Sequence, residues 1–143
     1  MPKVVFFTDL DPELHPLLTQ HAPSDYTVEV AESKTPVSEK TSLVEDADAI
    51  ILFPSRIEEE VLRSAKNLKH IQLVSAGFEH MDLELCKELG LTLSNNGGAN
   101  SIDVAEQTMA LILGIYRRLI DLDADVRNDR WFAMETGKTT YTI

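Results

Sequence analysis

The residues best suited to chemistry lie in four short polar segments, each of which directly follows an apolar run. Two of these segments contain glycine, Ser75-Ala76-Gly77 and Asn95-Asn96-Gly97-Gly98-Ala99-Asn100. A glycine lets a ligand approach the backbone closely, and successive N–H groups can form a nest for a carboxylate. The first segment is therefore either a carboxylate site or a tight turn. The second is either an anion contact at a helix N-terminus or a flexible loop that caps the helix.

Ionisable side chains in these segments also allow two interpretations. Arg56, in the segment Pro54-Ser55-Arg56, is either a partner for a substrate carboxylate or a surface arginine that forms ion pairs with the glutamates at 58–60. His80 is either an acid or base or a solvated loop histidine. Cys86 is expected to be a small core residue. The spacing of the other histidines supports no metal site; they are His15, His21 and His70.

Alternating strands and helices are expected to position these segments. Continuous apolar runs such as 3–8 are typical of strands that are buried on both faces. The expected strands are 3–8, 26–30, 47–53, 70–75 and 91–94, and the expected helices lie within 12–23, 57–65 and 83–89. This alternation predicts an α/β fold with a flavodoxin-like, doubly wound parallel sheet. Ligands bind beyond the carboxyl ends of the strands in such sheets, where the polar segments lie.

Two further stretches have a different character. The polar stretch 34–46 is expected to be a loop with at most one helical turn. From Ser101 to about Arg127 there is no turn signal, and the middle is apolar nearly all round, which predicts a long helix buried or packed against a partner. Asn100 or Ser101 is its expected N-cap. Gly90 is placed as the glycine that ends the preceding helix.

Composition and charge exclude several functions. The chain has 143 residues and a formal net charge of −11, so it repels nucleic acid. Its longest uncharged apolar run, 108–116, is too short for a membrane span, and its N-terminus lacks the features of a signal peptide. A lone cysteine cannot form an internal disulfide. A cytoplasmic protein is therefore expected.

No placement of the glycines forms a dinucleotide fingerprint. They lie at positions 77, 90, 97, 98, 114 and 137, which gives neither G-x-G-x-x-G nor a Walker A loop. The chain also has no nucleophile elbow of the G-x-S-x-G type. Residues 1–143 are thus not expected to hold a dinucleotide by themselves.

Several motifs, in conserved order and spacing, resemble those of D-isomer-specific 2-hydroxyacid dehydrogenases. The stretch 68–82 is similar to that family's strand and S-x-G-[YF]-[DE]-x-[IVM]-D loop, and 88–96 to its G-[IL]-x-[VL]-x-N strand. The stretch 100–108 is similar to the N-x-x-x-V-A-E-[HQ]-T helix start, and Tyr116-Arg117-Arg118 and Trp131 also fit. Together with matches upstream, the resemblance covers nearly the whole chain.

The resemblance implies a two-domain, dimeric enzyme that reduces small 2-keto acids or oxidises D-2-hydroxy acids with NAD or NADP. Ala76 and Gly77 would offer backbone N–H groups to the substrate carboxylate, and Asn100 would lie near the substrate. Val104 would touch the nicotinamide end of the cofactor. Arg56 is a further substrate-binding candidate, in a loop that varies within the family. The helix from Ser101 would contribute to a homodimer contact.

The resemblance also implies a division of the chain. Residues 1–100 would be a portion of the substrate-binding domain, 101–136 the crossover helix and connection, and 137–143 the start of a truncated nucleotide-binding domain. The family's arginine, glutamate and histidine that act on the substrate would lie beyond this sequence, so no catalytic residue is assigned. The chain alone is expected to be inactive; the alternative is a non-catalytic dimerisation or binding module derived from the family.

Overall fold

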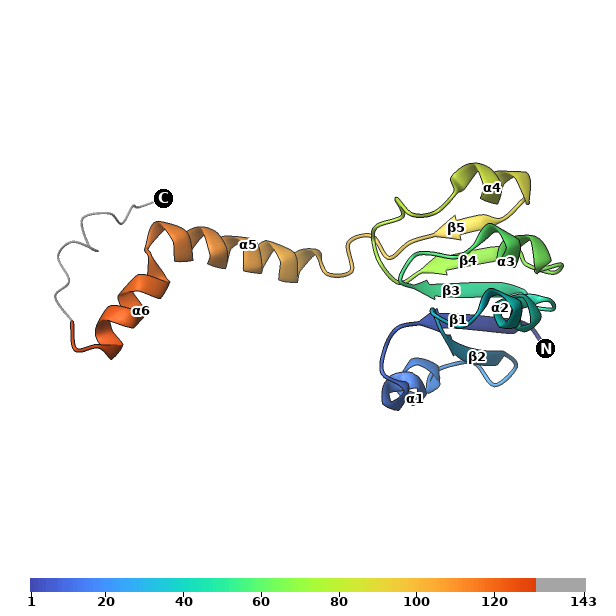
Figure 1. The fold of residues 1–143 in the computed structure, drawn as a ribbon, viewed down its shortest axis with the longest axis horizontal. Coiled ribbons are helices and arrows are strands. Elements are labelled where there is room, and N and C mark those ends of the chain that lie inside the picture. The colour runs from blue at the N-terminus through green and yellow to red at the C-terminus, as the bar shows by residue number, and fades with distance from the viewer. Residues whose placement is uncertain (131–143) are drawn as a thin grey trace. The chain divides into compact units, whose positions relative to one another are not determined.

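A computed structural model describes residues 1–130, and its centre is a five-stranded parallel sheet (Figure 1). The strands are β1 (Lys3–Thr8), β2 (Thr27–Glu32), β3 (Ala49–Phe53), β4 (His70–Leu73) and β5 (Thr92–Ser94). Their order is β2-β1-β3-β4-β5, and every neighbouring pair is parallel. This is the flavodoxin-like order, so the predicted fold class is confirmed.

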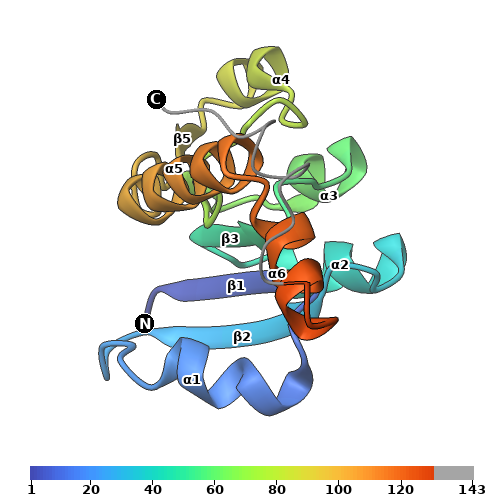
Figure 2. The same ribbon diagram turned by 90° about the vertical axis from the view of Figure 1, so that its left-hand side faces the viewer.

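The helices connect successive strands, as a parallel sheet requires. A short 3-10 turn (Pro12–Leu14) leads into α1, and two further helices, α5 and α6, follow β5. The α-helices are α1 (His15–Thr19), α2 (Val37–Val44), α3 (Glu59–Ser64), α4 (Leu83–Glu88), α5 (Ser101–Tyr116) and α6 (Leu119–Arg127). Helices α2 and α3 lie side by side against the sheet, and α1 lies next to the β2 edge (Figures 1 and 2).

The core lies between the sheet and the helices that cover it. The strands contribute large apolar side chains that are almost fully buried, among them Val5, Phe7, Ile50, Leu52, Ile71 and Leu73. The helices add Val44, Val61, Leu62, Leu85 and Cys86. Cys86 is a buried core residue, as expected, and burial raises the pKa of its thiol. Burial of these apolar surfaces is the main stabilising term for the sheet.

The stretch expected to be a loop contains helix α2, so that prediction was wrong. Lys40 and Val44 of α2 are buried, and Val37 packs against the core. These positions recur at helical spacing, but the middle one is a charged lysine, so the sequence does not show a continuous apolar stripe. The Lys40 stem is buried because its ammonium group lies over the Phe7 ring, 5.7 Å from the centroid, and pairs with Glu58.

The predicted single helix over 101–127 was also wrong in one respect, because it is broken after Tyr116. Arg118 adopts a left-handed conformation with φ of 48°, which ends α5 and starts α6. The Arg118 side chain pairs with Asp121 in the first turn of α6. A negative charge there favours a helix N-terminus, so a local ion pair stabilises the new start.

The helix ends otherwise follow the sequence signals. Gly90 follows α4 with φ of +68°, the left-handed conformation expected of a glycine at this position. Asp82 caps the start of α4 by accepting a hydrogen bond from the Leu85 N–H at 2.9 Å. Asn100 is the N-cap of α5, although its side chain makes no capping hydrogen bond.

An aspartate at the amino end of the sheet joins β1 to β3. The Lys3 N–H donates to Asp48 Oδ2 at 3.0 Å, and the Asp48 N–H donates back to the Lys3 carbonyl at 2.8 Å. The first of these bonds lowers the pKa of the Asp48 carboxyl, because it stabilises the charged form. The Lys3 ammonium lowers the pKa of Asp46 in the same way.

The chain divides into two compact units, Met1–Ala99 and Asn100–Ile143. Neither α5 nor α6 buries a residue. No helix in residues 1–130 is long and apolar enough to cross a bilayer. The predictions for Trp131, for the connection up to 136 and for 137–143 lie wholly or partly outside the described residues.

Candidate functional site

Three loops at the carboxyl ends of the strands are joined by side-chain contacts. Ser55 after β3 and Ser75 after β4 lie with their hydroxyl oxygens 2.5 Å apart. Asn95 after β5 donates its side-chain amide to the Ala76 carbonyl at 2.7 Å. Because the strands are parallel, their ends meet at one edge of the sheet, and these contacts hold the loops beside one another. The site predicted at this edge therefore has a defined framework.

The loop after β4 presents two free backbone donors. The N–H groups of Ala76 and Gly77 donate to no other residue within 1–130, whereas both carbonyls accept hydrogen bonds from side chains. A side chain at Gly77 would come within 2.8 Å of Glu79 Oε2, so the glycine leaves room for that carboxylate. Two adjacent free N–H groups suit a carboxylate ligand.

Arg56 contacts this loop and pairs with none of the glutamates that follow it. Its Nη2 donates to His80 Nε2 at 3.3 Å. Glu58 pairs instead with Lys40 at 3.0 Å, and Glu59 with Arg63 at 2.7 Å. The Glu59–Arg63 pair joins residues four positions apart within α3. The glutamate-paired interpretation of Arg56 does not hold, and His80 has a partner that the sequence did not reveal.

A cavity of about 520 Å³ lies beside the Arg56–His80 contact. Its lining comes from the loops that follow β1, β2, β3 and β4 and from helix α2. The lining residues are Asp9, Ser33, Lys34, Lys40, Pro54, Arg56, Ile57, Glu58 and His80. We call it the β1–β3 hollow. Lys40 was missed at the sequence level because a lysine in a polar stretch gives no sign of burial.

The remaining predicted site residues lie in the second unit. Asn100 precedes α5, and its carbonyl accepts a hydrogen bond from the Val104 N–H at 3.0 Å in the first helical turn. Both side chains are exposed in the chain. Their roles toward substrate and cofactor stay predictions, as do those of Ala76, Gly77 and Arg56.

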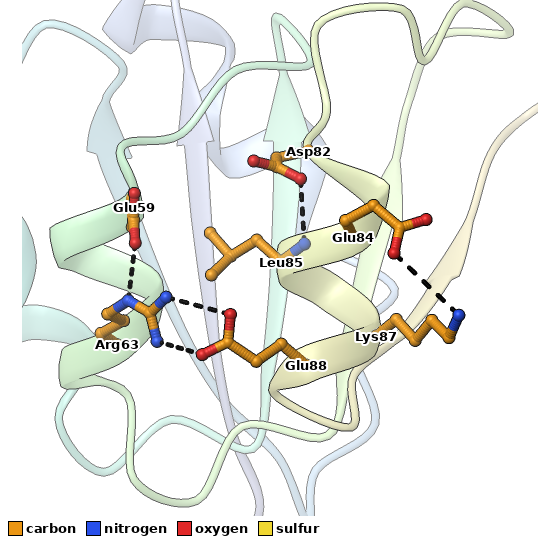
Figure 3. Close-up of a pocket in the computed structure, with 7 residues that line it drawn as sticks. All are labelled: Glu59, Arg63, Asp82, Glu84, Leu85, Lys87 and Glu88. Atoms are coloured by element: carbon orange, nitrogen blue, oxygen red, sulfur yellow. Dashed lines mark hydrogen bonds and ion pairs between the residues drawn. The ribbon is translucent and has the colours of Figure 1, made fainter.

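A second hollow, between α3 and α4, is dominated by ion pairs (Figure 3). The Arg63 guanidinium donates to Glu59 and, through two nitrogens, to Glu88 at 2.8 and 3.2 Å. These contacts raise the pKa of Arg63, and Arg63 lowers the pKa of Glu88. Asp82 caps α4 in the same region. Arg63 is paired with glutamates of both helices, so the contacts in this hollow connect α3 to α4 and leave no unpaired arginine there.

The described residues do not fit a dinucleotide. Gly77, Gly90, Gly97, Gly98 and Gly114 lack the fingerprint spacing, and Gly98, with φ of +86°, belongs to the turn before α5. The unit formed by β5, the loop with Gly97 and Gly98, and α5 has adjacent glycines in place of the G-x-G-x-x-G spacing, so it does not match the fingerprint. No step involving a bound dinucleotide is therefore assigned to these residues.

The chain matches the family model described as "D-isomer specific 2-hydroxyacid dehydrogenase, catalytic domain" over residues 4–142. The chain belongs to this family. A glyoxylate reductase of Aeropyrum pernix is 32% identical over 139 residues, which are 95% of this chain and 40% of that protein. The chain spans less than half the length of the curated relatives it matches.

Solved structures of other proteins have a similar fold. A protein of Pyrococcus horikoshii OT3 aligns with a TM-score of 0.71 and 28% identity, over 100% of this chain and 42% of its own. A D-lactate dehydrogenase from Aquifex aeolicus, solved with NAD and lactic acid, aligns with a TM-score of 0.68 and 28% identity. That alignment covers 89% of this chain and 38% of the Aquifex chain.

Proposed function

We propose that this chain supplies the substrate-binding part of an oxidoreductase that interconverts D-2-hydroxy acids and 2-oxo acids with NAD or NADP. The observation that carries the proposal is the pair of free N–H groups at Ala76 and Gly77, in the loop that carries the family motif. They bind the carboxylate that every such substrate has. The names of the relatives, a glyoxylate reductase and a D-lactate dehydrogenase, agree with this substrate class.

The other predicted residues have supporting roles in this proposal. Arg56 adds positive charge at the edge of the carboxylate site, which favours an acid over a neutral carbonyl compound. Asn100 contacts the substrate, and Val104 contacts the nicotinamide end of the cofactor. Hydride transfer by residues 1–143 alone is not expected, because the sequence contains no dinucleotide fingerprint.

Two measurements on the 143-residue chain test these statements. Pyruvate and D-lactate should shift the amide signals of Ala76 and Gly77 in ¹H–¹⁵N spectra, while acetamide, which has no carboxylate, should not. Oxidation of NADH or NADPH with glyoxylate, hydroxypyruvate or pyruvate should stay at the background rate. Unmoved amides would overturn the substrate role, and robust turnover would overturn the statement that this chain is inactive alone.

One observation favours a second candidate function, a non-catalytic module that forms a homodimer through α5. This helix exposes large apolar side chains, and Ile102 and Ile115 are each 73% exposed. Isolated apolar surface of this kind is typical of a protein–protein contact. Size-exclusion chromatography with light scattering should give a monodisperse dimer, and Ile115→Glu should convert it to a monomer. A monodisperse monomeric wild-type chain would contradict the module.

A further inference from the structure

The loops that follow β4 and β5 are joined by hydrogen bonds to the backbone. The two strands are parallel neighbours, so both loops leave the sheet side by side. The Asn96 N–H donates to the Ser75 carbonyl at 3.1 Å. The Asn95 side-chain amide donates to the next carbonyl, that of Ala76, at 2.7 Å. The loop after β5 therefore holds two successive carbonyl groups of the loop after β4.

These two carbonyls belong to the same peptide groups as the two free N–H donors. A planar peptide group joins the carbonyl of one residue to the N–H of the next. The Ser75 carbonyl therefore shares a plane with the Ala76 N–H, and the Ala76 carbonyl shares one with the Gly77 N–H. The cis peptide bond within residues 1–130 is Phe53–Pro54, so both of these peptides are trans. In a trans peptide the C=O and N–H bonds point in opposite directions, so holding the carbonyl fixes the direction of the N–H.

The two peptides differ in the kind of group that holds them. The Ser75 carbonyl accepts from a backbone N–H, which any residue except proline supplies at position 96. The Ala76 carbonyl accepts from the Asn95 side chain, so this contact depends on the residue type. A carbonyl that accepts a hydrogen bond polarises its peptide group, which makes the N–H of that group a stronger donor. Asn95 therefore acts on the Gly77 N–H from the opposite side of the peptide.

We propose that Asn95 is a positioning residue for substrate binding, because its side-chain amide orients and strengthens the Gly77 N–H that receives the substrate carboxylate. The inference rests on the proposed function, in which the N–H groups of Ala76 and Gly77 bind that carboxylate. Asn95 acts from the carbonyl side of the peptide, opposite the ligand, so its contact with Ala76 is not a substrate contact. Its side chain is exposed, so its role is not to fill the core.

D-Lactate titrated into the ¹⁵N- and ¹³C-labelled 143-residue chain tests this role. Asn95→Ala should raise the Kd about fivefold, less than the tenfold or more expected for complete loss of a charge-assisted hydrogen bond. Asn95→Asp should raise the Kd further, since a carboxylate cannot donate and repels the Ala76 carbonyl. Ser94→Asp is the control for added charge, because Ser94 is exposed and its side chain makes no hydrogen bond within residues 1–130. It should change the Kd by less than about twofold in about 0.15 M salt, which screens exposed charges.

The signals of two adjacent amides distinguish positioning from a general structural effect. In the ligand-free chain, Asn95→Ala should move the carbonyl ¹³C signal of Ala76 and the ¹⁵N signal of Gly77, which come from the peptide that Asn95 holds. The ¹⁵N signal of Ala76 comes from the peptide that Asn96 holds, and it should move less. In this variant D-lactate should still shift the Ala76 amide but shift the Gly77 amide less than in the wild type. The urea midpoint should stay at the wild-type value, because the Asn95 side chain is exposed.

The outcomes separate this inference from the proposed function. Wild-type affinity in Asn95→Ala, with Ala76 and Gly77 amides that still shift equally, would overturn the positioning role and keep the carboxylate site. An equal loss of shift at both amides with a lower urea midpoint would also overturn it, since Asn95 would then only support the fold. Unmoved amides of Ala76 and Gly77 in the wild-type chain would overturn the proposed function and the inference with it.

Discussion

Two arginines, seven residues apart in the sequence, lie in contrasting surroundings. Arg63 in α3 donates to two glutamates, Glu59 in the same helix and Glu88 in α4 (Figure 3). The side chain of Arg56, in the loop after β3, has one hydrogen-bond partner among residues 1–130, and this partner is His80. A paired arginine contributes to the connection between helices, whereas an unpaired one in a cavity is available to a ligand. The two arginines therefore differ in whether a carboxylate within residues 1–130 pairs with the guanidinium.

The largest effect should come from removing the support beneath the loops at the strand ends. Leu73, the last residue of β4, is fully buried directly before the Ala76–Gly77 loop. Leu73→Ala should lower the free energy of unfolding by about 2–5 kcal/mol, because it leaves a cavity in the core. Leu83→Ala is the control, since Leu83 is 47% exposed and its loss should change stability by less than about 0.5 kcal/mol. Urea unfolding followed by circular dichroism measures both, and equal losses would contradict the packing described.

The paired cation inside the β1–β3 hollow offers the next test. The Lys40 side chain is only 5% exposed, and Glu58 is its partner. Glu58→Gln should lower the free energy of unfolding by about 1–2 kcal/mol, because it leaves a buried ammonium with a weaker acceptor. Lys40→Met removes the charge but keeps the apolar stem over Phe7, so it should cost less. Urea unfolding at neutral pH compares the two variants. A larger loss of unfolding free energy for Lys40→Met than for Glu58→Gln would contradict this prediction and would mean that the charge pair itself stabilises the fold.

Substitutions at two glycines, Gly90 and Gly77, test backbone strain and ligand access separately. Gly90 has a left-handed φ of +68°, so Gly90→Ala should lower the free energy of unfolding by about 1 kcal/mol. Gly77 has no such φ, and its added methyl group would meet only the movable end of Glu79. Gly77→Ala should change stability by less than about 0.5 kcal/mol but weaken D-lactate binding. Thermal unfolding and the amide titration measure the two effects; the reverse ranking of stabilities would contradict this assignment.

The smallest expected effect is on the stability of the fold at acid pH. Because the Lys3 N–H lowers the pKa of folded Asp48, this carboxylate stabilises the fold above its ordinary pKa of 3.8. That contribution is lost as the pH falls through the lowered pKa. Asp48→Asn should therefore reduce stability at pH 6 and have a smaller effect at pH 2. Asp25→Asn is the control, since Asp25 is exposed and makes no hydrogen bond within residues 1–130. Unfolding curves at both pH values test this, and an equal loss at pH 2 and pH 6 would contradict it.

Most of the sheet could be predicted from the sequence because β1 and β3 are apolar runs and β2 alternates polar and apolar residues, both of which are typical of strands. The bounds of β1 agree with the prediction, β2 differs by one residue at its start and two at its end, and the other strands differ by one or two residues at one end. Helix α2 could not be predicted in the same way, since Lys40 interrupts its apolar stripe and is buried only through Phe7 and Glu58. The break at Arg118 was missed because an arginine gives no signal for a left-handed conformation.

The sequence by itself determined the family, the parallel sheet and the loop that carries Ala76 and Gly77, because these depend on local apolar runs and on motifs at fixed spacing. Only the tertiary structure decided which charges are paired. Arg56 has three glutamates close behind it in the chain, yet Glu58 pairs with Lys40, 18 positions away in sequence, and Glu59 pairs with Arg63 within α3. Side-chain pairing depends on which loops and helices lie next to each other, and the order of strands in the sheet sets that proximity.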